Sequence, residues 1–205
     1  MSQQSDQAAT VFIVDDDPAI RFAMQALMDS VNLKHEIFGS GDEFLQQFTD
    51  ERPGCLVLDI RMPGLGGLEL QEELPQRGNS LPVIFITGHG DVPMAVEAMQ
   101  KGAVDFIQKP FRDQDLLDRI REALKTDRER RQEQQHHAEV EERIARLTNR
   151  EREVFDLVVT GKPNKVIAYE LGVSQRTVEI HRARVMEKMQ ARSLADLVKM
   201  HMHQE

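Results

Sequence analysis

Five short apolar runs divide the first 112 residues, and they constrain the fold more than any other feature of the sequence. They are rich in β-branched and aromatic residues and span residues 10–14, 35–39, 55–59, 82–87 and 104–110. Between them, apolar residues recur at helical spacing in residues 18–31, 42–49, 65–74 and 92–102. Strands that alternate with helices through short loops pair in parallel, and helices then cover both faces of the sheet. The sequence therefore predicts an α/β fold with a doubly wound, five-stranded parallel sheet.

Polar side chains stand at the carboxyl ends of these predicted strands. In chain order they are Asp15, Asp16, Asp17, Asp59, Thr87 and Lys109. Because ligands of open parallel sheets bind outside the carboxyl ends of the strands, we expect a ligand site at this edge. Asp17 immediately precedes a predicted helix that begins with proline, so we assign it to the helix N-cap and not to the ligand site.

Several carboxylates at one edge of a sheet favour a divalent cation. Their mutual repulsion raises the pKa of each group, and a bound cation reverses this effect. Hard oxygen ligands with open positions suit Mg²⁺, which keeps water and accepts phosphate oxygens. A carboxylate beside Mg²⁺, a hydroxyl and an ammonium group can accept a phosphoryl group. Asp59 would attack phosphorus in line, Lys109 would neutralise the equatorial oxygens, and Thr87 would hydrogen-bond one of them.

Four sequence blocks resemble the receiver domain of bacterial response regulators. They are IVDDD, LVLDIRMPGLGG, FITGHG and DFIQKPF, and they occur in the order and at the spacing of that family. The resemblance covers residues 10–125 and implies a flavodoxin-like sheet with strand order 2-1-3-4-5. It implies Asp59 as the phosphorylation site. The ligands of Mg²⁺, or of Mn²⁺ in its place, are then Asp16, Asp59 and the backbone carbonyl of Arg61, with Asp15 acting through water.

The same resemblance implies a conformational switch. Thr87 is implied as the switch hydroxyl and Phe106 as the aromatic side chain that swings inward when Thr87 moves. The peptide bond between Lys109 and Pro110 is implied to be cis, which its position in a turn allows. The face formed by residues 92–111 would then change and dimerise.

A charged segment follows the predicted sheet. Residues 125–142 are almost entirely polar and contain neither glycine nor proline, although apolar spacing resumes at Val140 and Ile144. We therefore expect residues 126–146 to form a charged helical linker. The thin apolar stripe leaves two roles open, a solvated connector or the seam of a coiled coil, and a solvated connector is the more common of the two.

The last 58 residues predict a small all-α domain of four helices. Thr148 and Glu151 form a T-x-x-E capping box, and Ser174 can cap a later helix. Helices 163–171 and 174–189, with a short turn between them, form a helix-turn-helix pattern whose second helix can enter a major groove.

Nine residues of this pattern are candidates for DNA binding. Those placed to reach phosphates are Lys165, Arg176 and Thr177, those nearer the base edges are Glu179, Ile180 and Ala183, and the remaining basic residues are Arg182, Arg184 and Lys188. Val178, Val185 and Met189 lie on the opposite side of the helix, so we expect them to face the core.

The stretch NKVIAYELGVSQRTVEIH resembles the LuxR-type helix-turn-helix domain, and the resemblance extends through most of residues 147–205. Together with the receiver it is similar to the FixJ group of the NarL/FixJ family. This implies a two-component transcription factor with a cognate histidine kinase, a homodimer formed on phosphorylation and double-stranded promoter DNA as partners. RNA polymerase is a further candidate partner. The long charged linker departs from members with short linkers, in which the receiver can mask the recognition helix.

Composition excludes several classes of protein. The first ten residues have no signal-peptide pattern, no apolar run approaches the roughly 18 residues of a membrane span, and the single cysteine, Cys55, cannot form an internal disulfide. We therefore expect a cytoplasmic protein without a membrane partner.

Residues 148–205 carry 10 Lys and Arg against 8 Asp and Glu. This slight basic excess predicts that DNA binding requires a dimer on two half-sites.

Two other functions are compatible with parts of this pattern. A phosphatase could use the same pocket, but such enzymes carry a second acid two residues after the nucleophile, where this chain has Arg61. We therefore expect no turnover enzyme. A constitutive DNA-binding regulator could keep the receiver only as an interaction module, but the complete set of acids, Thr87 and Lys109 argues against a degenerate receiver.

Overall fold

The computed structural model describes residues 9–48, 52–88 and 92–202. Contacts within the chain divide it into two compact units, Met1–Arg130 and Arg131–Glu205. Within the described ranges, no helix combines the length and the hydropathy that a membrane crossing requires. The first unit holds the sheet, and the second holds the last helices of the chain.

A five-stranded parallel sheet forms the centre of the first unit. Its strands are β1 (Thr10–Val14), β2 (His35–Phe38), β3 (Gly54–Asp59), β4 (Val83–Thr87) and β5 (Asp105–Gln108), in the order β2-β1-β3-β4-β5. Every residue of β1 and β4 is buried, as expected for parallel strands that are covered on both faces. The predicted fold class and strand order are confirmed.

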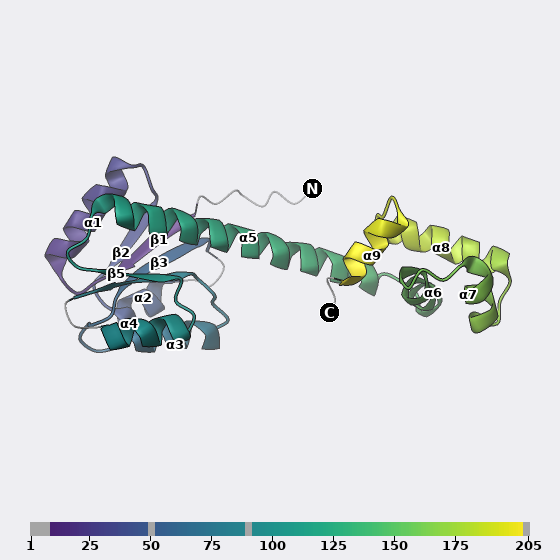
Figure 1. Ribbon diagram of the computed structural model, residues 1–205, viewed down its shortest axis with the longest axis horizontal. Helices are drawn as coiled ribbons and strands as arrows, with labels where there is room; N and C mark the ends of the chain where they lie inside the picture. Colours follow the sequence, from purple (N-terminus) through teal and green to yellow (C-terminus); the bar gives the residue numbers. More distant parts are fainter. Residues whose placement is uncertain (1–8, 49–51, 89–91, 203–205) are drawn as a thin grey trace. The chain divides into compact units, whose positions relative to one another are not determined.

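Helices cover both faces of this sheet (Figure 1). They are α1 (Pro18–Ser30), α2 (Gly41–Gln47), α3 (Gly67–Gln76), α4 (Val92–Gln100) and α5 (Asp113–Ala145). Met28 of α1 and Leu116 of α5 pack on one face, whereas Phe44 of α2, Leu70 of α3 and Ala98 of α4 pack on the other. Since all five strands run in the same direction, their carboxyl ends share the edge that is free to bind a ligand.

Asp17 caps α1, as predicted. Its Oδ1 accepts a hydrogen bond from the backbone N–H of Ala19 at 2.8 Å, and Pro18 occupies the first turn of the helix. The carboxylate thereby satisfies one of the free donors at the helix start.

A buried aspartate attaches α5 to the amino end of β3. Asp127 is 1% exposed, and its Oδ2 accepts a hydrogen bond from the backbone N–H of Gly54 at 2.9 Å. Its Oδ1 is paired with Arg130. Gly54 begins β3, and a Cβ at this position would collide with the backbone carbonyl of Thr10 on β1. The helix is therefore held to the sheet by a charge-assisted hydrogen bond as well as by apolar packing.

Replacing Asp127 with alanine should destabilise the first unit by roughly 1–3 kcal/mol, because the buried amide of Gly54 would lose its acceptor. Urea denaturation followed by circular dichroism measures the change. Asp118→Ala is the matched control, because Asp118 is an exposed aspartate on the same helix; it should change stability by less than about 0.5 kcal/mol. Equal losses in the two variants would contradict the anchoring role of Asp127.

The second unit has one core, which four helices share with the end of α5. The helices are α6 (Asn149–Val159), α7 (Asn164–Leu171), α8 (Gln175–Met189) and α9 (Leu194–Met202). Phe155, Val178 and Val185 lie in this core together with Val140 and Ile144 of α5. The four predicted helices are confirmed, and the last turns of α5 pack with them.

The predicted caps of this unit are also present. The backbone N–H of Glu151 donates to Thr148 Oγ1 at 3.3 Å, and the backbone N–H of Thr148 donates to Glu151 Oε2 at 2.9 Å, which completes the capping box of α6. Gly172 ends α7 with a φ of 65°, in the left-handed region that favours glycine. Ser174 Oγ accepts a hydrogen bond from the backbone N–H of Thr177 at the start of α8. Local sequence signals therefore fix both ends of the turn between α7 and α8.

Candidate functional site

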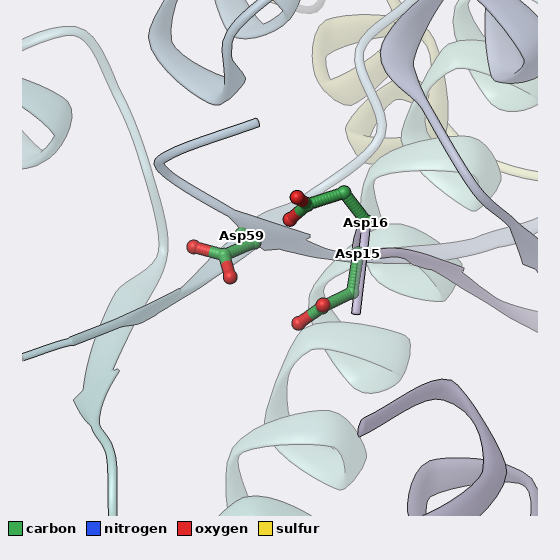
Figure 2. A group of neighbouring side chains, drawn as sticks. All are labelled: Asp15, Asp16 and Asp59. Atoms are coloured by element: carbon green, nitrogen blue, oxygen red, sulfur yellow. The ribbon is translucent and has the colours of Figure 1, made fainter. Parts of the chain in front are cut away.

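Three carboxyl groups meet at the carboxyl end of the sheet. Asp15 and Asp16 directly follow β1, and Asp59 is the last residue of the neighbouring strand β3. One carboxylate oxygen from each residue lies within 4.8 Å of the others. Figure 2 shows Asp15 and Asp16 extending toward Asp59 from the end of β1. Asp15 is buried, Asp59 is half-buried and Asp16 is exposed, so this acidic cluster reaches solvent on the side of Asp16.

Lys109 joins two of the three carboxylates. Its Nζ donates to Asp15 Oδ2 at 2.8 Å and to Asp59 Oδ2 at 2.7 Å. Burial lowers the pKa of Lys109, but the hydrogen bonds to the two aspartates outweigh burial and leave the pKa above its ordinary value. The ammonium group is therefore charged at neutral pH. The peptide bond between Lys109 and Pro110 is cis, as the family resemblance implied.

The acidic cluster has the donor chemistry of a divalent metal site. Burial raises the pKa of Asp15 above its ordinary value, although hydrogen bonds from Lys109 and from the backbone N–H of Asp17 oppose this; the nearby charge of Asp59 adds to the increase. Crowded hard oxygens of this kind are the ligands of Mg²⁺ and similar cations. The cluster can therefore hold a metal ion.

Two hydrogen bonds connect the acidic cluster to its surroundings. The backbone N–H of Arg61 donates to Asp59 Oδ1 at 3.1 Å. Arg21 lies one turn into α1, and its Nη1 donates to the backbone carbonyl of Asp15 at 2.7 Å. The sequence predicted a role for the carbonyl of Arg61 but none for Arg21, because no local pattern indicates which backbone group a helix side chain will reach.

Thr87 and Phe106 lie on the neighbouring strands β4 and β5. Thr87 is buried, and its hydroxyl donates to the backbone carbonyl of Gly88 at 3.3 Å. In the strand register Thr87 pairs with Gln108, two residues beyond Phe106. The side chain of Phe106 is 37% exposed. In this conformation Phe106 is therefore partly outside the core, and its predicted movement stays a prediction.

Helix α8 has the two faces that its sequence predicted. Val178, Val185 and Met189 are fully buried. The exposed candidates for DNA binding are Lys165, Arg176, Glu179, Ile180, Ala183 and Arg184. Ile180 leaves 47% of its surface exposed, which is unusual for an isoleucine on a helix with a buried apolar face. These side chains are accessible to a ligand.

The other three candidates are bound within the unit. Thr177 Oγ1 lies 2.8 Å from the hydroxyl of Ser174, and Arg182 Nη1 donates to Asn164 Oδ1 at 2.9 Å. Lys188 Nζ donates to a backbone carbonyl between α5 and α6 and to a carboxylate in the first turn of α6. DNA contact by these three residues stays a prediction.

The carboxylate that binds Lys188 is Glu151. Lys188 Nζ donates to Glu151 Oε2 at 2.6 Å, and the side chain of Glu151 is 3% exposed. The hydrogen bond from Lys188, followed by those from Thr148, lowers the pKa of Glu151 to about 2. The sequence predicted Glu151 as a capping residue but did not indicate its pairing with Lys188.

This low pKa predicts how the stability of the second unit depends on pH. A carboxyl group whose pKa is lowered by folding stabilises the fold at every pH above its pKa in the unfolded chain. This contribution to the free energy of unfolding disappears as pH falls from about 4.5 toward 2. Glu151→Gln keeps a capping side chain but loses the charge, so it should cost about 1–2 kcal/mol at neutral pH and flatten the curve in this range. Thermal unfolding between pH 2 and pH 7, with exposed Glu153→Gln as control, measures the effect. Parallel curves for wild type and Glu151→Gln would contradict it.

Two family models match the two units. The model for the response regulator receiver domain matches residues 11–121, and the model for bacterial regulatory proteins of the luxR family matches residues 145–201. The first match contains the whole acidic cluster and Lys109, and it alone spans more than half of the chain. The chain belongs to the response regulator family.

Relatives of this response regulator align with it across both units. Nodulation protein W of Bradyrhizobium diazoefficiens is 49% identical over 197 residues, which cover 96% of this chain and 87% of that protein. The transcriptional regulatory protein FixJ of Azorhizobium caulinodans is 46% identical over 194 residues, which cover 95% of this chain and 92% of that protein. The predicted similarity to the FixJ group is confirmed.

Solved structures of response regulators agree with this assignment. The structure of StyR has a TM-score of 0.86 at 44% identity and covers 95% of this chain and 98% of StyR. Full-length FixJ from B. japonicum has a TM-score of 0.61 at 40% identity and covers 95% of this chain and 96% of that one. The response regulator thus joins a receiver domain to a LuxR-type DNA-binding domain, as transcriptional regulators of two-component systems do. A histidine kinase and DNA are the partners that this pair of domains implies.

Proposed function

We propose that this response regulator takes a phosphoryl group from a histidine kinase onto Asp59, then dimerises and binds promoter DNA in the cytoplasm. The observation that carries the proposal is the position of Lys109. Its ammonium group contacts Asp15 and Asp59 at once, at 2.8 and 2.7 Å. The fixed positive charge of Lys109 beside Asp59 stabilises the negative charge that a phosphoryl group brings to this carboxylate.

The transfer is a simple exchange of bonds at phosphorus. A carboxylate oxygen of Asp59 forms a bond to phosphorus while the bond from phosphorus to the kinase histidine nitrogen breaks, and that nitrogen keeps the electron pair. Lys109 then pairs with a phosphoryl oxygen, and the Thr87 hydroxyl turns from the carbonyl of Gly88 to donate to another. Movement of Thr87 would open the space into which Phe106 swings.

The acidic cluster fits Mg²⁺, or Mn²⁺ in its place, by its donor set. Asp16, Asp59 and the backbone carbonyl of Arg61 would hold the ion, with Asp15 acting through water. When bound, the ion supplies positive charge opposite the phosphoryl oxygens. Asp16 would bind the ion directly and Asp15 through water, while Asp59 would also supply the carboxylate oxygen that attacks phosphorus.

The output is DNA recognition by paired α8 helices. Lys165, Arg176 and Thr177 would contact phosphates, and Glu179, Ile180 and Ala183 would face the bases. The face of residues 92–111 would form the dimer, which places two helices on an inverted repeat; RNA polymerase would then be a further partner. Moving the protein from mostly monomer to mostly dimer needs only about 3–5 kcal/mol of differential stability.

Two rival functions make different predictions. A turnover phosphatase would need a general acid near Asp59, and the residue two positions later is the exposed Arg61, so we propose that the protein is not a turnover enzyme. A constitutive DNA-binding regulator would not need the contacts of Lys109 with both carboxylates. It would bind DNA equally well with or without phosphate.

The proposal is tested by phosphorylation of the full chain with acetyl phosphate and Mg²⁺. We expect the mass of one phosphoryl group per chain, a shift from monomer to dimer in sedimentation, and tighter binding to a duplex selected from a random library. Labelling without either later change would leave the receiver chemistry intact and favour the constitutive rival. Continuous release of inorganic phosphate at enzymatic rates would favour the phosphatase.

Removing divalent cations should abolish phosphorylation. With EDTA in excess, we expect the labelling rate to fall at least about 100-fold, because the carboxylates of the acidic cluster would then repel the anionic donor. Added Mg²⁺ or Mn²⁺ should restore labelling, whereas K⁺ at equal ionic strength should not. Mass spectrometry of the intact protein measures the rate, and full labelling in EDTA would overturn the metal assignment.

A further inference from the structure

Lys188 connects three segments of the second unit. It lies near the end of α8, and its Nζ donates to the backbone carbonyl of Arg146 at 3.0 Å and to Glu151 Oε2 at 2.6 Å. Arg146 directly follows α5, and Glu151 belongs to the first turn of α6. One ammonium group thus satisfies a backbone carbonyl after α5 and pairs with the carboxylate of the α6 capping box.

A second contact joins the same segments. Arg143 of α5 donates from Nη1 to the backbone carbonyl of Met189, the last residue of α8, at 3.4 Å. Met189 is fully buried, and it shares the core with Val140 and Ile144 of α5. The end of α8 is therefore held by polar contacts on its surface and by apolar packing beneath them.

These contacts make Lys188 a poor candidate for a phosphate contact. To reach DNA, its ammonium group would have to leave a carboxylate that is 3% exposed. A nearly buried carboxylate that loses its partner is strongly unfavourable. Arg184, one turn earlier on the same helix, is exposed, so the helix offers another basic side chain that is accessible to phosphate.

We propose that Glu151 and Lys188 are positioning residues for DNA recognition. Through this pair, the start of α6 and the end of α5 fix the carboxyl end of α8 and so set the angle at which its exposed face approaches DNA. Lys188 acts through α8 and touches no phosphate. The inference rests on the proposed function in one respect, the assignment of α8 as the recognition helix.

Salt dependence separates positioning from phosphate contact. The full-length phosphorylated protein is titrated with two duplexes of equal length, one selected from a random library by the wild type and one of random sequence. Each phosphate contact contributes about 0.9 to the slope of log affinity against log salt concentration. We expect Lys188→Gln to keep the wild-type slope while weakening binding to the selected duplex about 10-fold and hardly changing binding to the random one.

Two further variants make the comparison decisive. Arg184→Gln is the matched control, and it should reduce the slope by about 0.9 on both duplexes. Lys188→Arg, which keeps a charge beside Glu151, should recover most of the affinity. Glu151→Gln should weaken binding to the selected duplex as Lys188→Gln does, and the double variant should be no weaker than either single variant, because both remove the same pair.

Binding is measured below the unfolding temperature of every variant, so that a change in affinity does not come from unfolding. Each alternative result can then be interpreted. A slope reduced by about 0.9 in Lys188→Gln would show a phosphate contact and overturn the proposal. Unchanged affinity for the selected duplex would show that the pair only stabilises the fold, which also overturns it. If Arg184→Gln changed neither slope nor affinity, the assignment of α8 as the recognition helix would fail, and the inference would fail with it.

Discussion

Asp59→Asn is expected to leave the protein folded and unable to accept a phosphoryl group. The amide has no charged oxygen to attack phosphorus, so labelling by acetyl phosphate should fall at least about 1,000-fold. Lys109 keeps its hydrogen bond to Asp15 in this variant, so the pocket should retain its shape. Intact mass after incubation with acetyl phosphate and Mg²⁺ measures the loss, and sedimentation should show that dimer formation is lost with it.

Asp17→Asn is the matched control for this prediction. It makes the same chemical change two residues from Asp15, and asparagine caps a helix about as well as aspartate. Since Asp17 serves the start of α1, we expect labelling at the wild-type rate. If Asp59→Asn were labelled as fast as Asp17→Asn, the phosphoryl group would be on another residue, and the proposed role of Asp59 would be wrong.

The sheet was predictable because its information is local. Each strand is a short apolar run between turn residues, and the burial of every residue in β1 and β4 follows from those runs. Alternation with helices then fixes parallel pairing and places the strand ends at one edge. The order of the strands came from the family resemblance, because apolar runs of similar composition do not specify their neighbours.

The acidic cluster was predictable for the same reason. The carboxyl ends of parallel strands all lie on the same side of the sheet. Carboxylates at the ends of the adjacent strands β1 and β3 are therefore close together, as Asp15, Asp16 and Asp59 are. Proline in the first turn of α1 separated the capping role of Asp17 from the others.

Contacts between distant segments were not predictable. Asp127 binds the amide of Gly54 across 73 residues, and Lys188 binds Glu151 across 37. In the sequence Asp127 is one acid within a charged stretch, and Lys188 is one base on a basic helix. Their partners and their burial depend on how whole helices and strands pack together. The spacing of residues within one helix does not predict this packing.

The linker shows what apolar spacing can and cannot predict. The renewed apolar spacing at Val140 and Ile144 was visible in the sequence, and both side chains lie in the core of the second unit. What spacing did not indicate was which partners they would have. The two units divide after Arg130, inside the segment 126–146 that was predicted to link the domains.

Replacing Phe155 with alanine is expected to unfold the second unit and leave the first intact. The ring of Phe155 is fully buried in α6, edge-on to the ring of His201 at 5.8 Å between centroids, and the guanidinium of Arg152 lies 5.7 Å from its centroid. Loss of such a side chain costs about 3–5 kcal/mol. A unit of this size has a total stability of only about 5 kcal/mol, so little of it would remain folded.

The prediction can be tested with a separate measurement for each unit. In Phe155→Ala, binding to the selected duplex should be lost, and thermal unfolding followed by circular dichroism should lack the transition of the helical unit. Labelling of Asp59 by acetyl phosphate should continue, because the acidic cluster lies wholly within the first unit. Tyr169→Ala is the matched control, since it removes an aromatic ring that is 89% exposed in the same unit and should change stability by less than about 0.5 kcal/mol. If Phe155→Ala also abolished labelling, the receiver would depend on the fold of the DNA-binding unit, and the independence of the two cores would be wrong.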